Sequence, residues 1–308
     1  MRQTSDQASV TPPPASWRVG DVTITRIVEA QHVFPVELLF HNATTEAVLE
    51  LPWLQPHFLT PDGQVLFSFH ALVVDAPGKR ILVDTCYGND KDRMPQDLFT
   101  NLQTSFLHDL EAAGFSRDSI DVVLCTHLHV DHVGWNTMLV EGTWVPTFPM
   151  ARYIFSKADF EYWSHPTDVP TSGGWADVQA KGFEDSVRPV VEAGLVDLVD
   201  SHHAICDEVS LVPTPGHSPG HVSVRIVSQG QEALITGDIA HHPSQLAYLD
   251  WAPDIDFDPE QAVETRLQVF GDAADRSVLV IGTHWAGATA GMIHRCGDTF
   301  RVECQSNT

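Results

Sequence analysis

Hydrophobic and polar residues alternate in short runs along most of this chain, a pattern that predicts many β-strands. The clearest example covers residues 222–227, where apolar side chains recur at every second position. Further strands are expected at residues 19–28, 64–75, 79–85, 120–125, 144–148, 152–155, 195–199, 208–213, 232–236, 277–281 and 299–302. Residues 76–78, Ala-Pro-Gly, predict the turn of a hairpin between two of these strands.

Segments with apolar residues three or four positions apart predict helices. They cover residues 98–113, 156–163, 176–193 and 258–270. Ser156 and Asp159 have the spacing of a capping box at the start of the second helix. Pro259 suits the first turn of the fourth. Strands interspersed with helices indicate an α/β fold, and the absence of a G-x-G-x-x-G motif argues against a nucleotide-binding fold.

Three segments show neither pattern. Residues 1–16 are polar and proline-rich, which predicts a disordered or surface-wrapping arm. Residues 32–61 form a long insertion with several aromatic residues, which could cover a site or plug one end of the core; the sequence leaves both open. Residues 165–175 are rich in Pro, Gly and Thr and predict a second irregular loop.

A dense group of chemically active residues follows the apolar run 120–125. The group consists of His127, His129, Asp131 and His132, within six positions. A lone histidine is usually an ordinary core or surface residue, but three with an aspartate on one loop after a strand point to a shared ligand. Neutral imidazole and carboxylate groups suit a borderline ion such as zinc. If the first two residues face one ion, the last two can turn to a second.

Residues of the same type follow three later apolar runs. His217 lies in Thr-Pro-Gly-His, Asp238 follows Thr-Gly, and His284 follows Gly-Thr. The order HxHxDH, His, Asp, His resembles the metallo-β-lactamase superfamily, and the resemblance extends from His127 to His284. It implies an αββα sandwich, in which two mixed β-sheets face each other with helices outside. Because no Gly/Ser-rich or Pro-rich linker separates these residues, we expect residues 17–308 to form a single hydrolase domain.

The resemblance also implies roles for individual residues. One metal ion would be held by His127, His129 and His217, the other by Asp131, His132 and His284, and Asp238 would lie between them. Asp84, at the end of a predicted strand, resembles the family's aspartate that supports a ligand histidine through a hydrogen bond. His221 matches no ligand position, and we expect it to pack or to support a ligand.

This ligand set predicts hydrolysis. Two divalent ions that share a carboxylate bring the pKa of a bridging water toward neutrality, so a metal-bridging hydroxide is available, and one ion can polarise a carbonyl or phosphoryl oxygen. Asp131 could also orient the attacking water and pass its proton to the leaving group. Zinc is the expected metal, with manganese, iron and cobalt as alternatives.

Charge and cysteine content narrow the class of protein. The chain carries 17 basic and 41 acidic side chains, a formal net charge of −24. Such a surface argues against nucleic acid and anionic membranes as partners, although it also fits a salt-adapted or simply very soluble protein.

The five cysteines form no C-x-x-C motif, so no disulfide framework is expected. We see no signal core and no apolar run of membrane-spanning length, and we expect a cytoplasmic protein, with a homodimer left open.

Two features bear on the substrate. Metallo-β-lactamases proper commonly carry cysteine where this chain has Asp238, and acyl-homoserine lactonases carry tyrosine where it has His241. With Gln245, His241 is more similar to the methyl-parathion-hydrolase branch, and we expect its imidazole either to donate a hydrogen bond to the developing oxyanion or to cap the turn. Aromatic residues near the candidate ligands predict apolar walls that suit an uncharged substrate. They are Trp135, Tyr248, Trp251 and Trp285.

The favoured interpretation is a dinuclear zinc hydrolase, a lactonase or esterase that opens a small neutral lactone or ester. A phosphotriester hydrolase would use the same centre, and a β-lactamase-type amide hydrolase is a further alternative. A mononuclear iron dioxygenase is disfavoured because the second ligand set is complete. A non-catalytic binding protein of this family usually loses ligands, and here all seven are present.

Overall fold

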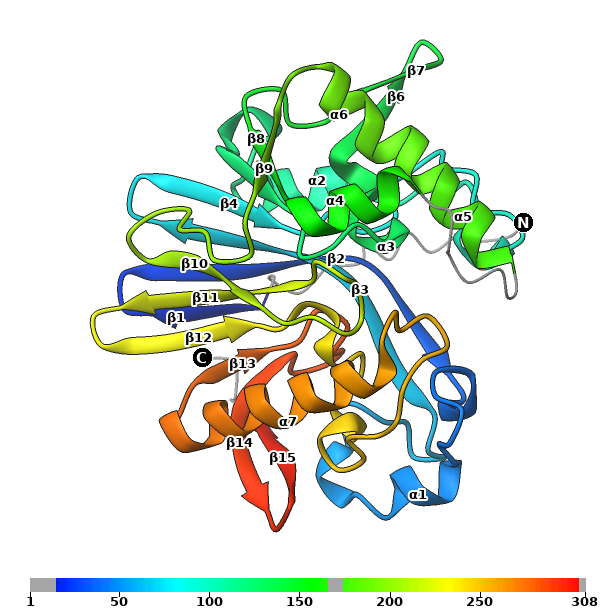
Figure 1. The fold of residues 1–308 in the computed structure, drawn as a ribbon, viewed down its shortest axis with the longest axis vertical. Helices are drawn as coiled ribbons and strands as arrows, with labels where there is room; N and C mark the ends of the chain where they lie inside the picture. Colours follow the sequence, from blue (N-terminus) through cyan, green and yellow to red (C-terminus); the bar gives the residue numbers. More distant parts are fainter. Residues whose placement is uncertain (1–14, 166–173, 305–308) are drawn as a thin grey trace, which may run out of the picture.

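Two β-sheets form the centre of the molecule, seen here in a computed structural model that describes residues 15–165 and 174–304 (Figure 1). The larger sheet has the order β1 (Ser16–Val19), β2 (Val22–Phe34), β3 (Val65–Ala76), β4 (Lys79–Val83), β5 (Val122–Leu124), β8 (Arg152–Ser156), β9 (Val196–Val199). The smaller has the order β10 (Val209–Pro213), β11 (Val222–Ser228), β12 (Gln231–Ile235), β13 (Leu279–Ile281), β14 (Ala290–Cys296), β15 (Thr299–Cys304).

Both sheets are mixed. In the larger sheet β1 to β4 pair antiparallel, whereas β4, β5, β8 and β9 pair parallel. In the smaller sheet β12 and β13 are parallel and the other neighbours antiparallel. Parallel neighbours end at the same edge of a sheet, so β4 and β5 end side by side, as do β12 and β13. A separate hairpin joins β6 (Thr137–Val140) and β7 (Thr143–Pro146).

Alternation along the strands divides the core into layers. Ile24 and Leu124 of the larger sheet share one buried cluster with Val224 and Ile281 of the smaller sheet. The other faces of the strands contribute to a second cluster, which also contains residues from the helices. The helices are α1 (Thr45–Leu49), α2 (Phe106–Ala112), α3 (Val130–Val133), α4 (Lys157–Ser164), α5 (Trp175–Gly182), α6 (Arg188–Glu192) and α7 (Pro259–Arg276). The expected αββα sandwich is confirmed.

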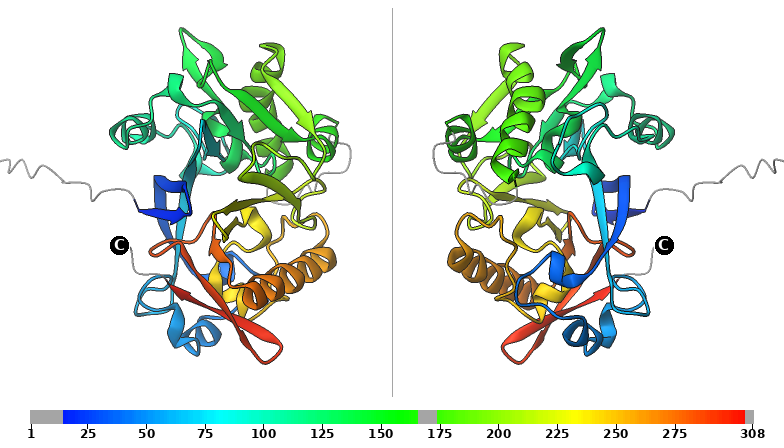
Figure 2. Two further views of the ribbon diagram at one scale, coloured as in Figure 1. Left: turned by 90° about the vertical axis from the view of Figure 1, so that its left-hand side faces the viewer. Right: turned by 90° about the vertical axis from the view of Figure 1, so that its right-hand side faces the viewer.

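The helices lie in two separate parts of the molecule. Helices α4 to α6 gather at one end of the long axis, and α7 packs on β14 near the other end (Figures 1 and 2). The predicted fourth helix begins as expected, where Asp258 caps its start by accepting from the Gln261 N–H. It is longer than expected at its other end, because the chain leaves the helix only at Ser277. No helix within residues 15–165 and 174–304 has the length and apolar character needed to cross a membrane.

Two helix predictions were wrong in extent. Of residues 98–113 only the second half forms α2, because Leu98 is 50% exposed and Asn101 adopts a left-handed φ of 52°. Residues 176–193 form α5 and α6 separated by a π-helical turn, Phe183–Val187. Pro189 lies in the first turn of α6, where its missing N–H costs nothing.

Three smaller expectations also failed. Strand β14 was missed because its second half, His294 to Cys296, is exposed and lacks alternation. The capping box at the start of α4 does not form, since Ser156 makes no capping hydrogen bond and Asp159 turns away to other partners. Ser16, placed in the N-terminal arm, already belongs to β1, and the arm's first 14 residues lie outside the described chain.

Candidate metal centre

The candidate ligands all follow strand ends. His127 and His129 lie on the loop between β5 and α3, and Asp131 and His132 lie in α3 itself. Three further residues come from the smaller sheet: His217 after β10, Asp238 in the 3-10 turn after β12, and His284 after β13. Because β12 and β13 are parallel, their ends deliver Asp238 and His284 to the same edge.

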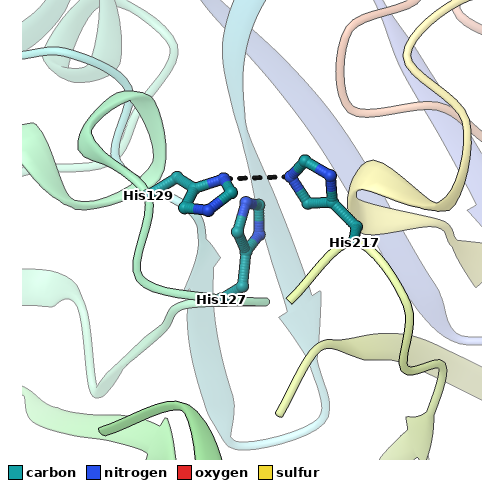
Figure 3. Close-up of side chains that lie close together, drawn as sticks. All are labelled: His127, His129 and His217. Atoms are coloured by element: carbon teal, nitrogen blue, oxygen red, sulfur yellow. Dashed lines mark hydrogen bonds between the residues drawn. The ribbon is translucent and has the colours of Figure 1, made fainter. Parts of the chain in front are cut away.

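Three histidines form the first group. His127, His129 and His217 are each at most 2% exposed, and their ligand atoms lie within 4.8 Å of one another. Their rings turn toward a common point from two loops (Figure 3), with His217 Nε2 2.9 Å from His129 Nδ1. Burial lowers the pKa of all three well below the usual histidine value, which keeps the imidazoles in the neutral form that binds metal.

The second group adds two carboxylates. It contains Asp131, His132, Asp238 and His284, again with ligand atoms within 4.8 Å of one another. One oxygen of Asp238, Oδ2, lies 3.2 Å from His132 Nε2 and 3.1 Å from His284 Nε2. The same oxygen is 3.6 Å from His217 Nε2 and 3.9 Å from His127 Nε2. Asp238 therefore reaches both groups, as the resemblance implied.

The side chains fit divalent metal ions. The His132 and His284 Nε2 atoms are 3.3 Å apart, and two imidazole nitrogens at this distance need a proton or a cation between them. His127 Nε2 and Asp238 Oδ1 are buried and have no hydrogen-bond partner among the described residues. Buried polar atoms without partners are costly, and a metal ion would satisfy them. Imidazole nitrogen with carboxylate oxygen is the donor set of zinc and similar ions.

Hydrogen bonds from outside the site orient the two histidines of the second group. Asp84 accepts from His132 Nδ1–H at 3.0 Å and from the Thr126 N–H at 2.8 Å, the role that the resemblance implied. His284 Nδ1–H donates to the Ser68 carbonyl oxygen at 3.1 Å. Such bonds fix the tautomer and aim Nε2 into the site.

Asp256 is a supporting residue that sequence reasoning missed. Its Oδ1 accepts from His217 Nδ1–H at 2.7 Å, and Arg266 lies 3.8 Å from its other oxygen. Asp256 stands in the acidic run Asp254-Ile-Asp-Phe-Asp258, which has no motif spacing and gave no signal. Only the fold brings this run against the loop of His217.

His221 supports the centre without belonging to it. It is in neither ligand group, and its Nε2 accepts the backbone N–H of Asp238 at 2.8 Å while Nδ1–H donates to the Thr214 carbonyl. Burial lowers its pKa to about 4, consistent with a neutral ring that accepts at Nε2. A Cβ on Gly237 would lie 2.5 Å from this nitrogen, so glycine is required beside Asp238.

Glu29 holds the loop that lies against α3. It sits at the bulge of β2, between Val28 and Ala30, and accepts from the N–H groups of Tyr87 and Gly88 and from Trp135 Nε1. Burial raises its pKa to about 7, against the opposing effect of these donors. The supported loop packs so closely on Gly134 that a Cβ there would lie 1.9 Å from the Tyr87 backbone. Glycine at position 134 is therefore what allows this close approach.

A cavity of about 350 Å³ opens onto the second group. Asp131, Asp238, His241 and His284 form its floor. Its walls are largely aromatic and include Phe34, Phe67, Phe69, Phe99 and Trp175. No described lysine or arginine lines it. The walls suit an uncharged, apolar substrate.

The insertion at residues 32–61 covers this cavity in part. The 3-10 turn η1 (Val36–Leu38) and its flanks supply Phe34, Leu38 and Phe40 to the lining, so of the two alternatives the covering role applies to this half. Phe58, from the second half, is fully buried and packs against Trp285, so this part plugs the core.

The four aromatic residues expected as walls pack elsewhere. Trp135 stacks on Phe106, Tyr248 stacks on Trp251, and Trp285 is fully buried; none of them lines the cavity. Closeness to a ligand in the sequence did not bring these side chains into the cavity, because successive side chains of a loop point in different directions.

His241 forms part of the cavity floor. Its side chain is 8% exposed, Nε2 lies 3.2 Å from Asp238 Oδ2, and neither ring nitrogen has a hydrogen-bond partner among the described residues. The turn is capped by His242, whose ring accepts the Ser244 N–H, and by Gln245, which accepts from the His241 N–H. The side chain of His241 does not cap the turn. It also offers a ligand atom to a third group, with His217 and Asp238.

Comparisons with known proteins bear on the family and the fold. The family model described as the metallo-beta-lactamase superfamily matches residues 66–284. The N-acyl homoserine lactonase AiiA of Bacillus thuringiensis subsp. kurstaki is 24% identical over 157 residues, 51% of this chain and 52% of the relative. AttM of Azorhizobium caulinodans, also an N-acyl homoserine lactonase, is 31% identical over 137 residues, 43% and 46% of the two chains. This chain thus spans about half the length of these curated relatives.

Solved structures match over nearly the whole chain. The hydrolase AbOPH of the beta lactamase superfamily aligns with a TM-score of 0.79 and 24% identity, covering 96% of this chain and 98% of that one. The dizinc quorum-quenching lactonase AidC aligns with a TM-score of 0.73 and 18% identity, covering 94% and 97%. At these identities the likeness shows the shared fold.

Proposed function

The chain belongs to the metallo-beta-lactamase superfamily, and from this premise we propose that it is a dinuclear metal-dependent hydrolase that opens a small neutral lactone or ester. The observation that carries the proposal is the position of Asp238 Oδ2, within 4 Å of four imidazole nitrogens from both groups. A single carboxylate within reach of two ligand groups is the arrangement that holds two cations close together.

The proposed ligands are those that the resemblance implied. His127, His129 and His217 would hold one ion, Asp131, His132 and His284 the other, and Asp238 both. When bound, divalent ions of the zinc type would supply an activated water at neutral pH and polarise the carbonyl or phosphoryl oxygen of the substrate. The native metal is part of the proposal, with zinc first.

Asp131 is placed to handle the proton. Of the two carboxylates in the second group, Asp131 has the more exposed side chain, 14% against 3% for Asp238. It also lines the cavity. A carboxylate at this point can orient the attacking water, accept its proton as a base and then, as the acid, give it to the leaving oxygen. His241, across the floor, would donate Nε2–H to the oxygen that gains negative charge.

The cavity supports a neutral substrate. An aromatic lining without lysine or arginine offers no cationic side chain to clamp a substrate carboxylate, which counts against β-lactams and other anionic substrates. The relatives named as N-acyl homoserine lactonases favour a lactone among uncharged substrates. The proposed substrate is therefore a small neutral molecule. The net charge of −24 argues against nucleic acid or an anionic membrane as a partner.

A phosphotriester is the second candidate. The same centre can attack phosphorus, phosphotriesters are uncharged, and His241 stands where lactonases carry tyrosine. A mononuclear dioxygenase has less support, because the second group, with Asp131, His132, Asp238 and His284, offers a full set of ligand atoms.

A substrate panel on a metal-analysed preparation tests the proposal. Purified protein is assayed against lactones, aryl esters, phosphotriesters and β-lactams before and after chelation, with zinc added back. We expect two ions per chain, highest kcat/KM on a lactone or ester, and loss and recovery of activity with metal. A preparation that stays fully active with one ion, or that turns over β-lactams best, would overturn the dinuclear lactonase assignment.

A further inference from the structure

Asp159 touches both loops that carry the three-histidine group. It lies in α4 and is fully buried. Its Oδ2 accepts the Leu128 N–H at 2.7 Å, between His127 and His129. Its Oδ1 accepts the Ser218 hydroxyl at 2.5 Å and the Gly220 N–H at 3.0 Å, on the loop just after His217.

The same peptide is held from the other side. The carbonyl oxygen of Leu128 accepts from Gln179 Nε2 at 2.5 Å, so side chains of α4 and α5 take both polar groups of this residue. Gln179 is 2% exposed. A backbone fixed at both its N–H and its C=O leaves the flanking histidines little freedom to rotate.

The loop of His217 is seated directly on the start of α4. A Cβ on Gly220 would lie 2.3 Å from the Asp159 backbone nitrogen and 2.6 Å from Ser156 Oγ. Glycine is therefore needed for the Gly220 N–H to reach the carboxylate. A second bridge between the loops, from the Val222 N–H to the Thr126 carbonyl at 3.0 Å, lies before His127 rather than between the ligands.

Helices α4 and α5 also supply aromatic contacts to the group. Trp163 and Trp175 meet the His129 ring edge-on at centroid distances of 5.2 and 5.1 Å. The two helices thus contact the metal loop through Asp159, Gln179 and two indole rings. The buried carboxylate is the contact that reaches the other loop as well.

We propose that Asp159 is a positioning residue that locks the His127–His129 loop to the His217 loop and thereby sets the affinity of the three-histidine group for its metal ion. The inference rests on the proposed function, since it needs that group to bind metal. Ligand atoms must be held within about 0.5 Å of the required geometry, and here they come from two segments distant in the sequence. One carboxylate with an oxygen on each loop supplies that constraint.

Asp159→Asn separates the two roles of the carboxylate at constant size. An amide has one acceptor oxygen and one donor nitrogen, so it can accept from Leu128 or from Gly220 but not from both. The remaining backbone N–H then faces the NH₂ group of the asparagine side chain and has no acceptor. We expect the affinity of the three-histidine group for zinc to fall about 10- to 100-fold, the range for lost supporting hydrogen bonds at metal sites.

The measurement is the amount of zinc that the purified protein retains at increasing chelator concentration, with zinc alone as the probe. We expect the variant to lose the ion of the three-histidine group at a lower chelator concentration than wild type does. The ion of the second group should be retained as in wild type. Cobalt substitution then reports, in the visible spectrum, a changed environment of the weakened ion. Glu161→Gln is the matched control, since it makes the same chemical change on the exposed face of α4 and should leave both measurements as in wild type.

Ser218→Ala is the second variant if Asp159→Asn does not fold. It removes one donor from the carboxylate and keeps both backbone bonds, so we expect about a fivefold weaker first ion. Either variant with wild-type zinc release overturns the inference and leaves the proposed function intact. A lower melting temperature of the metal-free protein without a shift in zinc release also overturns it. A wild-type protein that binds no zinc overturns the proposed function, and this inference with it.

Discussion

Replacing His241 with alanine should lower kcat by about 10² to 10³-fold and leave metal content unchanged. His241 lines the cavity floor, with Nε2 3.2 Å from Asp238 Oδ2. A substrate oxygen drawn toward the centre would come within reach of this nitrogen. The imidazole is 8% exposed, so water would not replace its hydrogen bond.

The magnitude follows from what the ring does and does not contact. Removing one oxyanion donor costs about 2.7 to 4 kcal/mol of transition-state stabilisation in a water-excluded site. Neither ring nitrogen of His241 has a hydrogen-bond partner among the described residues, so alanine leaves no polar group newly unsatisfied. The effect should therefore fall on kcat and only weakly on folding.

The assay compares kcat and kcat/KM on a lactone and a phosphotriester at matched metal loading. His242→Ala is the neighbouring control, because its ring contacts Ser244 and the Phe58 carbonyl instead of the cavity. That variant should lose about 1 to 3 kcal/mol of stability and keep its kcat below its melting temperature. His241→Tyr restores the lactonase residue and should keep activity on lactones.

Two results would refute the reasoning. Unchanged kcat and kcat/KM across both substrates in His241→Ala would mean that the imidazole takes no part in the reaction. A fall in bound metal that matches the fall in kcat would instead make His241 a ligand, through the group that it forms with His217 and Asp238.

Further predictions concern the centre and its supports. Asp238→Ala should remove most activity and at least one ion, because both groups lose a shared ligand, whereas His221→Ala should retain metal and much of the rate; equal behaviour in metal analysis would contradict the assignment. Asp256→Asn should weaken zinc binding by about 10-fold, since His217 loses a charged acceptor, and chelator titration measures it. Between its ordinary pKa of 4.5 and its folded value of about 7, Glu29 holds a proton that the unfolded chain has released, so stability should fall as pH rises through this window, by up to about 3 kcal/mol. Urea unfolding at several pH values should show that decline in wild type and a shallower one in Glu29→Gln; parallel curves would place the folded pKa near 4.5.

Much of the candidate centre could be predicted from the sequence because its signals are local. His127, His129, Asp131 and His132 lie in one short loop and turn after a strand, and the strand end itself delivers them to the sheet edge. The strands were predictable for the same reason, since alternation reflects a choice between two faces at each position.

The helix and capping predictions were wrong where contacts with residues distant in the sequence decided the local structure. Leu98 fits a helical pattern but is half exposed, and the chain turns at Asn101 before α2 begins. Ser156 and Asp159 have capping-box spacing, yet three donors from two distant loops claim the carboxylate. A buried carboxylate takes the partners that best satisfy it, and local spacing does not reveal them.

By itself the sequence predicted most of the strands, the resemblance to the family to which the chain belongs and the seven residues that we propose as ligands. Only the tertiary structure decided that Asp159 joins two loops, that Asp256 supports His217, and that the first half of the insertion forms a cavity wall. The physical reason is the range of the interactions. Periodicity and motif spacing act over a few residues, whereas the satisfaction of a buried charge depends on whichever segments the two sheets bring together.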